Sequence, residues 1–329
     1  MMELTEANQI RTQLVDRRHR LEHEIGRIGA QPALAHLLEE VDAALARVSA
    51  GTFGLCEECQ DVIEPDRIAA DPLVRFCLDH LPPAEQRALE RDLQLAAEIQ
   101  RGLLPAVRTE LPRWDVAYHY RAARIVSGDY CDVIAAPTGD VYFMVGDVSG
   151  KGVAASMLMA HMHAMFRALV PSGLPLEALV DRASRVFCES TLPMHYATLV
   201  CGKAAPSGDV ELCNAGHPPP LLIRRAAIEP VDSTGLPIGM FCGSRVGVTR
   251  LTLAPEDALL LYTDGLLDAE DAERCPYGAD RLAAVAGRAC RVSPQSVLDA
   301  CISDLARHVG ATPYADDVTV MVVARRPLS

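Results

Sequence analysis

The chain has 329 residues, 50% of them hydrophobic and 23% charged, which is ordinary for a globular protein of about two domains. Its formal net charge of −13 argues against DNA or an anionic membrane as the main partner, because binding to either needs a cationic face. The N-terminal segment is too polar for a signal peptide. The longest apolar stretch, Val153 to Val170, contains two histidines and an arginine, so we expect a buried helix there and no membrane span. Three of the 11 cysteines lie close together and eight are scattered from Cys131 to Cys301, which favours a reducing, cytoplasmic location where most thiols are small core residues.

The first 50 residues are expected to form a helical hairpin. Residues 4–27 and 33–48 repeat apolar residues at helical spacing, and the segment from Gly29 to Pro32 interrupts the pattern. Pro32 is well placed to start the second helix. The pattern predicts two antiparallel helices joined by a short turn over residues 1–50.

Residues 51–82 carry a pattern typical of a zinc finger. Cys56 and Cys59 form one pair separated by two residues, and Cys77 and His80 form a second. Each pair can present two ligands to one ion, and two pairs complete a tetrahedral set of soft donors that favours Zn²⁺. Because protein fills all four positions, the predicted zinc is structural, or at most part of a redox or metal sensor, with no place for a catalytic water.

The GTFGLCEEC opening and the FCLDH close of this segment, together with the hairpin, resemble the DksA/TraR family of zinc-finger proteins. Members of that family act on RNA polymerase through acidic residues at the hairpin tip. In this chain the tip, residues 29–32, contains no carboxylate, and His80 stands where the family has its fourth cysteine. The resemblance implies a small zinc-finger fold and makes RNA polymerase one candidate partner.

A connecting segment follows over residues 83–112, and its first part, residues 83–104, is an amphipathic helical pattern that ends before Pro105. The apolar stripe consists of Leu89, Leu93, Ala96 and Leu103, with Leu95 and Ile99 beside it. Two interpretations remain open. The helix packs on its own domain, or it pairs between two protomers of a homodimer and transmits a signal.

From Trp114 onward, short strand patterns alternate with helical patterns, and we place one domain over residues 113–329. Strands are expected at 116–120, 133–136, 141–145, 197–203, 210–214, 221–224, 246–253, 259–263 and 318–324. Helices are expected at 152–170, 175–190, 278–288 and 294–309. Hairpin-like strands with helices gathered in pairs predict two sheets covered by helices, not a βαβ repeat.

The centre of this domain is the stretch 141–159, VYFMVGDVSGKGVAASMLM, in which a strand pattern passes through a glycine corner into a helix. A carboxylate at the end of a buried strand, here Asp147, can present an oxygen ligand to a hard cation. A nucleotide-binding P-loop does not fit. Only three residues separate Gly146 from Gly150, and Lys151 is followed by glycine where serine or threonine is needed.

Carboxylates recur at four such corners, three of which stand directly at the end or start of an apolar strand pattern. The corners are Ser127–Asp132 (SGDYCD), Gly146–Gly150 (GDVSG), Tyr262–Gly265 (YTDG) and Tyr314–Thr319 (YADDVT). One aspartate at a strand end is ordinary turn chemistry. Several converging carboxylates repel one another unless a divalent cation neutralises them, so the set predicts a metal site.

These corners also carry a second resemblance. The motifs SGDYCD, VGDVSGKGVAASMLMA, NAGHPPPLLI, GLPIGM, YTDGLLDAED and ADDVTVMVV resemble, in order and spacing, the SpoIIE/RsbU-type serine phosphatases of the metal-dependent protein phosphatase (PPM) superfamily. Upstream, LERDLQLAAEIQRGLLP resembles the helix that precedes their catalytic domain. The resemblance covers about residues 84–325 and implies an α+β fold, a four-layer α-β-β-α sandwich with the metals at one end of the paired sheets.

The resemblance also implies a cofactor, two Mn²⁺ or Mg²⁺ ions, and a set of oxygen ligands. The implied ligands are Asp129, Asp147, the Val148 carbonyl, Asp264 and Asp316, with Asp317 adjacent. Asp147 is implied to bridge the two ions, and Asp129 to support one of them. Two such metals generate hydroxide near neutral pH and clamp the phosphoryl oxygens, so no covalent nucleophile is required.

Other positions match the family less directly. Arg124, five residues before Asp129, matches an arginine that holds the substrate phosphate in part of the superfamily, and Arg121 is also close. Ser149 stands where eukaryotic members place a histidine proton donor, so the general acid is left open, with water as one candidate. His217, in NAGHPPP, matches a family loop whose role we interpret as structural.

The second resemblance thus implies a serine/threonine phosphatase that acts on a phosphorylated regulatory protein of the anti-sigma-factor-antagonist type, regulated by the zinc-finger module. The alternative is a transcription regulator that binds RNA polymerase through the zinc finger and keeps the phosphatase-like domain as a scaffold.

Overall fold

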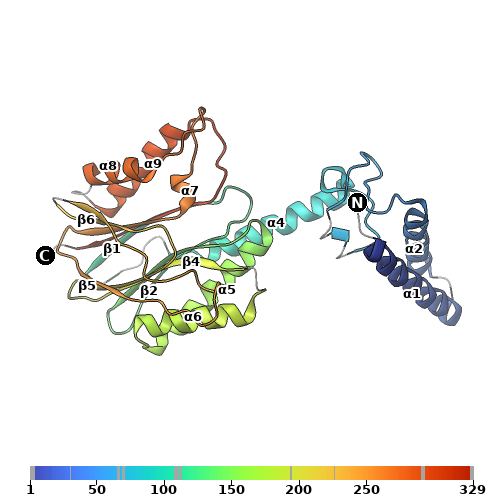
Figure 1. Ribbon diagram of the computed structural model, residues 1–329, viewed down its shortest axis with the longest axis horizontal. Helices are drawn as coiled ribbons and strands as arrows, with labels where there is room; N and C mark the ends of the chain where they lie inside the picture. Colours follow the sequence, from blue (N-terminus) through green and yellow to red (C-terminus); the bar gives the residue numbers. More distant parts are fainter. Residues whose placement is uncertain are drawn as a thin grey trace. The chain divides into compact units, whose positions relative to one another are not determined.

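The computed structural model divides the chain into two compact units, Met1–Arg91 and Asp92–Ser329 (Figure 1). The division falls within helix α4 (Pro83–Leu103), the predicted connecting helix. The residues that the structure describes are 4–29, 31–64, 67–68, 71–106, 111, 113–192, 195–225, 227–289 and 293–326.

The first unit begins with the predicted helical hairpin, α1 (Leu4–Ile28) and α2 (Pro32–Ala50). Pro32 lies in the first turn of α2, where a backbone N–H would have no helical partner. The helix ends at Gly51, whose φ of 72° is readily adopted only without a side chain and lets its N–H reach carbonyl groups of the last turn. The residues buried where the two helices pack are Leu14, Val41 and Ala44.

The cysteine-rich segment packs on this hairpin and contains a short helix, η1 (Leu78–His80). Ile10 and Phe53 contact both the hairpin core and the core of the cysteine-rich segment. Arg47 of α2 adds a hydrogen bond to the Val74 carbonyl oxygen at 3.1 Å. The hairpin and the cysteine-rich segment therefore form one packed body.

The second unit contains two five-stranded sheets in which every neighbouring pair of strands runs antiparallel. One sheet has the order β1-β10-β9-β6-β7, namely Trp114–Arg121, Val318–Arg325, Ala258–Tyr262, Leu221–Ile223 and Ile228–Pro230. The other has the order β2-β3-β4-β5-β8, namely Asp129–Ala135, Val141–Val148, Ala197–Ala204, Asp209–Ala215 and Thr249–Thr252.

Helices cover the outer face of each sheet, which gives four layers (Figure 1). On the sheet that contains β3 lie α5 (Val153–Leu169), η2 (Val170–Ser172) and α6 (Leu176–Ser190). On the sheet that contains β10 lie α8 (Ala279–Ala289) and α9 (Pro294–Val309). Apolar cores fill the three interfaces between layers, and the predicted α-β-β-α sandwich is confirmed.

Strand β3 shows how the sequence builds two of these interfaces. Phe143 and Val145 face the other sheet, whereas Tyr142 and Met144 face α5 and α6. All four are buried, as expected for an internal strand whose successive side chains point to opposite faces. By the same alternation Asp147 belongs to the face that meets the other sheet.

The apolar segment Val153–Ser172 is long and apolar enough to cross a membrane by length and composition alone. In the structure its residues Met159, Met162 and Phe166 are buried in the core that α5 shares with the neighbouring sheet. The segment is therefore a core helix of the sandwich, as its interrupting polar residues predicted.

Some elements differ from the predictions. The strand predicted at 246–253 covers only Thr249–Thr252, and β2 begins at Asp129 instead of at residue 133. The short elements β7 and α7 (Asp264–Leu267) were not predicted, because three or four residues carry no readable periodicity.

Four described cysteines of this unit are the predicted core thiols, Cys275 is exposed, and two others form a disulfide. Cys188 in α6 and Cys242 form a disulfide bond, with Cα atoms 5.7 Å apart, which their spacing in the sequence does not reveal. The buried free thiols are Cys131, Cys201, Cys213 and Cys301.

Asp132 belongs to the SGDYCD corner, but it lies on the helix-facing side of β2 and is fully buried. Its carboxylate forms two hydrogen bonds with the Arg167 guanidinium of α5, at 2.6 and 2.8 Å, and lies 3.8 Å from His163 Nε2. Asp132 therefore joins α5 to the sheet and takes no part in the acidic cluster.

Removing the cationic partner should cost more stability than neutralising the carboxylate. Arg167→Met removes the bidentate cationic partner of a buried carboxylate and leaves it the Val133 N–H and the more distant His163, so we expect a loss of about 3 kcal/mol in the free energy of unfolding. Asp132→Asn keeps a hydrogen-bond acceptor and leaves Arg167, whose side chain is 42% exposed, in contact with water, so we expect a loss of roughly 1–2 kcal/mol. Urea unfolding of both variants measures the difference, and equal losses would contradict this account.

Candidate active site

The predicted acidic corners meet at one end of the two sheets. In the β2–β3 ladder Asp129 lies directly opposite Asp147. In the other sheet Asp264 starts α7 just after β9, and Asp316 lies just before the neighbouring strand β10. Repulsion from Asp264 and Asp316 acts on Asp147, and repulsion from Asp147 acts on Asp129, so the four carboxylates lie within electrostatic range at this edge and are called the acidic cluster.

Asp129 is the buried member of this cluster and joins the two sheets. Its Oδ2 accepts hydrogen bonds from the Thr263 hydroxyl, just after β9, at 2.9 Å and from the Thr319 hydroxyl of β10 at 2.5 Å. Its backbone N–H donates to the Ser127 hydroxyl at 3.1 Å. Burial, followed by repulsion from Asp147, raises the pKa of Asp129 well above its ordinary value despite these hydroxyl donors.

The pKa of Asp147 is raised by its burial and by the neighbouring carboxylates. Burial and the charges of Asp264, Asp316 and Asp317, in that order, raise its pKa from 3.8 to about 7, and Lys151 opposes the shift. The pKa of Asp264 is raised as well, by burial and then by Asp316. Carboxylates that raise one another's pKa in this way form a site that a divalent cation would stabilise.

Gly128 lines the space in front of two predicted ligand atoms. A Cβ on this residue would lie 3.2 Å from the Val148 carbonyl oxygen and 3.4 Å from Asp147 Oδ1. The two oxygens therefore border one small space that any side chain at position 128 would narrow. Carboxylate and carbonyl oxygens are the ligands that Mg²⁺ and Mn²⁺ prefer, so the donor set fits the predicted ions.

Asp316 and Asp317 make different contacts in this site. Both carboxylate oxygens of Asp317 accept backbone hydrogen bonds, from Ala123 at 2.8 Å and from Gly128 at 2.9 Å. Asp317 thus holds the loop between β1 and β2 against the cluster. Asp316 forms a 2.8 Å ion pair with Nζ of Lys151, a residue whose contribution the sequence analysis missed.

The two candidate phosphate-binding arginines differ in their surroundings. Arg124 is exposed in the loop that Asp317 holds, next to Ala123. The guanidinium of Arg121 lies 4.1 Å from the ring centroid of Tyr314, in a cation–π contact. Both arginines are exposed, but the guanidinium of Arg121 is engaged by Tyr314 of the YADDVT corner.

Ser149, the residue at the position of the eukaryotic proton donor, bonds to the backbone. Its N–H donates to the Tyr196 carbonyl at 2.8 Å, and its Oγ accepts from the Tyr196 N–H at 3.0 Å. This reciprocal pair fixes the end of β3 to the start of β4, which gives Ser149 a structural role at the corner.

Gln100 of α4 supports the site from outside the sheets and was not predicted. Its side-chain amide donates to the Ser127 carbonyl at 2.7 Å and accepts from the Ser127 N–H at 3.0 Å, and the residue is 6% exposed. Ser127 in turn accepts from the Asp129 backbone. Nothing in the sequence marked Gln100, whereas Thr263 and Thr319 could have been noted because they lie inside the YTDG and DDVT motifs.

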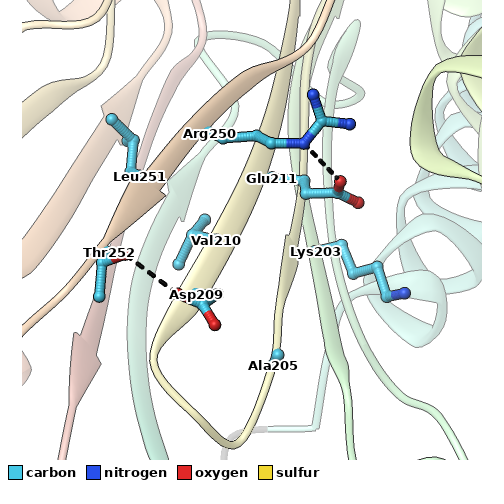
Figure 2. A pocket seen from close by; sticks show the side chains of 8 residues that line it. All are labelled: Lys203, Ala205, Asp209, Val210, Glu211, Arg250, Leu251 and Thr252. Carbon is cyan, nitrogen blue, oxygen red and sulfur yellow. Dashed lines mark hydrogen bonds and ion pairs between the residues drawn. The ribbon is translucent and has the colours of Figure 1, made fainter.

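A separate cavity of about 400 Å³ lies on the sheet that contains β3. Figure 2 shows the side chains that line it. It lies at the far end from the cluster, because its residue Lys203 pairs with Tyr142 at the start of β3 and Asp147 is near the end. The polar groups that line it are paired with one another or with a neighbour, as in the Arg250–Glu211 bond of 3.2 Å. It does not contribute to the candidate site.

The four predicted zinc ligands come together in the first unit. The ligand atoms of Cys56, Cys59, Cys77 and His80 all lie within 4.8 Å of one another. Cys59 Sγ is 3.8 Å from Cys77 Sγ, and Cys77 Sγ is 3.2 Å from His80 Nδ1. Three thiols and an imidazole at this spacing fit a closed tetrahedral zinc site.

Comparison with known proteins decides the family. The sequence profile described as stage II sporulation protein E (SpoIIE) matches residues 137–326, more than half of the chain. The chain belongs to the SpoIIE family.

Protein IcfG of Synechocystis is 26% identical over 263 residues, which cover 71% of this chain and 41% of that protein. Phosphoserine phosphatase RsbP of Bacillus subtilis is 26% identical over 187 residues, 54% of this chain and 46% of that protein, so the chain spans less than half the length of either relative.

Solved structures share the fold of the second unit. The RsbU and RsbW domains of Rv1364c from Mycobacterium tuberculosis match with a TM-score of 0.60 and 28% identity, over 69% of this chain and 64% of that one. The SiaA-PP2C domain of Pseudomonas aeruginosa matches with a TM-score of 0.64 and 19% identity, over 74% of this chain and 98% of that one. The two-sheet sandwich is thus the fold of PP2C-type phosphatase domains.

The raised pKa of Asp147 makes the stability of the metal-free protein depend on pH. Its folded-state pKa, about 7, lies above the ordinary 3.8, so the associated stability is fully present below about pH 4 and is lost as the pH rises through 7. We expect the melting temperature in EDTA to fall over this range. Mn²⁺ should raise it more at pH 8 than at pH 5, and Asp147→Asn should flatten the pH dependence. Thermal melts test this, and parallel profiles for wild type and variant would disprove it.

Proposed function

We propose that this chain is a metal-dependent protein phosphatase that hydrolyses phosphoserine or phosphothreonine on a regulatory protein. The observation that carries the proposal is the convergence of Asp129, Asp147, Asp264 and Asp316 from two sheets at one edge. Burial, followed by repulsion from Asp264, Asp316 and Asp317, raises the pKa of Asp147 to about 7, so a bound cation would stabilise the charged carboxylates. Membership of the SpoIIE family and the PP2C-type sandwich agree with this chemistry.

The first group of residues would bind the metal ions. Asp147, the Val148 carbonyl, Asp129, Asp264 and Asp316 would hold two Mn²⁺ or Mg²⁺ ions. Bound there, such ions supply hydroxide near neutral pH and neutralise the charge of the phosphoryl oxygens.

Other residues orient the ligands and the substrate. Thr263 and Thr319 fix the Asp129 carboxylate through their hydroxyl groups. Asp317 fixes the loop that carries the exposed Arg124, and to this guanidinium we assign the binding of the substrate phosphate. No residue of the chain has to form a covalent bond to the substrate.

The substrate class and the setting are part of the proposal. RsbP is a phosphoserine phosphatase, and the Rv1364c structure combines RsbU and RsbW domains. By analogy we assign this chain a phosphorylated anti-sigma-factor antagonist as substrate and place it in the cytoplasm.

The N-terminal unit is proposed as a DksA/TraR-like zinc module that regulates the phosphatase through α4. This helix starts in the zinc-bearing unit, and its Gln100 bonds to Ser127, two residues before Asp129. The exposed side chains of Leu95 and Ile99 on α4 offer an apolar stripe through which two copies could pair as a homodimer.

Substitution of the bridging ligand tests the enzymatic proposal. Asp147→Asn should lower Mn²⁺-dependent hydrolysis of p-nitrophenyl phosphate by about 10³-fold or more, because it removes a charge worth several kcal/mol in the transition state. Asp132→Asn is the matched control, a buried carboxylate on the neighbouring strand that faces away from the cluster, and its rate per folded molecule should stay near wild type. Full activity of Asp147→Asn, or of wild type in EDTA, would refute the proposal. Dephosphorylation of purified phosphorylated antagonists then identifies the substrate.

Zinc binding is tested by composition and exchange. Cys77→Ser should reduce the zinc content from about one ion per chain to near zero and expose residues 51–82 to hydrogen exchange, because a structural zinc contributes on the order of 10 kcal/mol. Cys275→Ser changes an exposed free cysteine of the second unit and should alter neither quantity. Wild-type protein without zinc would rule the site out.

A further inference from the structure

His217 lies in the segment that crosses from one sheet to the other, between β5 and β6. The ring is buried, with 3% of the residue exposed. Its backbone N–H donates to Asn214 Oδ1 at 2.9 Å, which holds the NAGHPPP turn in shape. From the sequence this loop was interpreted as structural. Its contacts also connect it to β4 and to β9.

The first of these contacts connects His217 to the residue opposite Asp147. His217 Nδ1 lies 2.8 Å from the Thr198 hydroxyl of β4. Thr198 is directly opposite Asp147 in the β3–β4 ladder. Residues directly opposite each other in an antiparallel pair project from the same face of the sheet, so Thr198 is the side-chain neighbour of Asp147 on the face that meets the other sheet.

The second contact leads to Asp264. The backbone of Tyr262, the last residue of β9, faces the His217 ring closely enough to favour its protonated form. The Tyr262 hydroxyl also donates to the Pro219 carbonyl at 2.9 Å, which ties the loop to β9 a second time. Asp264 follows Tyr262 by two residues. His217 therefore stands between the strand end that carries Asp147 and the strand end that carries Asp264.

The His217 ring is neutral, with one nitrogen that donates and one that accepts a hydrogen bond. Burial lowers the pKa of His217 to about 3, against the opposing effect of the Tyr262 backbone, so the ring is neutral. A neutral imidazole donates from one nitrogen and accepts at the other. With hydrogen on Nε2, the Thr198 hydroxyl donates to Nδ1, and Nε2–H is the remaining donor of the ring.

The Nε2 donor of His217 is unpaired. Across the part of the chain that the structure describes, Nε2 has no hydrogen-bond partner, although it is buried. An unpaired buried donor is unfavourable, and the backbone of Tyr262 in β9, which already acts on the ring, could accept from Nε2 if β9 and β4 came closer. A cation held by carboxylates of both sheets would favour such an approach.

We propose that His217 is a positioning residue that couples β4 to β9 and sets the spacing of the carboxylates on the two sheets, so that its loss weakens divalent-cation binding. The inference rests on the proposed function insofar as it assumes that the acidic cluster binds the cation. It adds a residue that touches neither cation nor substrate and acts through Thr198 and Tyr262.

The test is Mn²⁺ affinity measured on the full chain by titration calorimetry, with melting temperature as a second readout. His217→Ala should bind Mn²⁺ about tenfold more weakly or worse, as when groups that orient metal ligands are removed. Thr198→Val should weaken binding in the same direction, and the double variant should lose less than the sum of the two, because both act through one contact. His217→Gln, whose amide reaches toward Tyr262, should recover part of the affinity.

A control separates positioning from general loss of stability. Tyr277→Phe removes a buried 3.0 Å hydrogen bond to Asp304 among the helices that cover the other face, and should lower the melting temperature with Mn²⁺ affinity within about twofold of wild type. His217→Ala with wild-type affinity per folded molecule, beside a wild type that binds Mn²⁺, overturns the inference alone. A wild type that binds no Mn²⁺ overturns the inference and the proposed function together. A wild type that binds Mn²⁺ but hydrolyses no phosphate ester overturns only the function, and the variants still decide the inference.

Discussion

The structure depends on one electrostatic constraint, the convergence of carboxylates from two packed sheets at one edge. Asp129 is the most demanding member, since it is buried between the sheets and lies opposite Asp147. The fold accommodates it with two hydroxyl donors, Thr263 just after β9 and Thr319 of β10. These bonds require the strands of the two sheets to end at matching levels. The same strand registers therefore set both the sandwich core and the acidic edge. A shift of one residue in register would expose apolar core residues or leave a buried carboxylate without its hydrogen-bond partners.

The same constraint explains the glycines in two of the corners, YTDG and SGDYCD. A Cβ on Gly265 would lie 2.0 Å from the Asp317 carbonyl oxygen, so the YTDG corner can approach β10 only without a side chain. Gly128 has ordinary backbone angles, but its N–H must reach Asp317 and its Cα faces the oxygens of Asp147 and Val148. At both corners glycine permits close approach of backbone to ligand, which is a stronger requirement than turn formation.

Much of this could be predicted from the sequence, and the exceptions have physical causes. Asp147 and Asp264 each end an apolar strand pattern, and the apolar periods of the domain predicted two helix-covered sheets. Asp132 shares a motif with Asp129, but an odd separation within a strand turns it to the opposite face, and the late predicted start of β2 hid this. The roles of Gln100 and His217 could not be predicted, because their partners are distant in sequence and only the packed fold brings them together.

The contacts also limit how strongly the N-terminal unit could control the chemistry through α4. Within the phosphatase unit, Gln100 contacts the site through two hydrogen bonds to Ser127, and these act on Asp129 through the loop backbone. A buried hydrogen bond contributes about 1 kcal/mol net, so the pair can bias the loop by roughly 2 kcal/mol. Such a bias changes the population of a competent site about 30-fold, because ~1.4 kcal/mol corresponds to a factor of ten. A regulator acting by this route would therefore raise or lower the phosphatase activity by degrees. Whether the protein is active at all would depend on the affinity of the carboxylates for their cations.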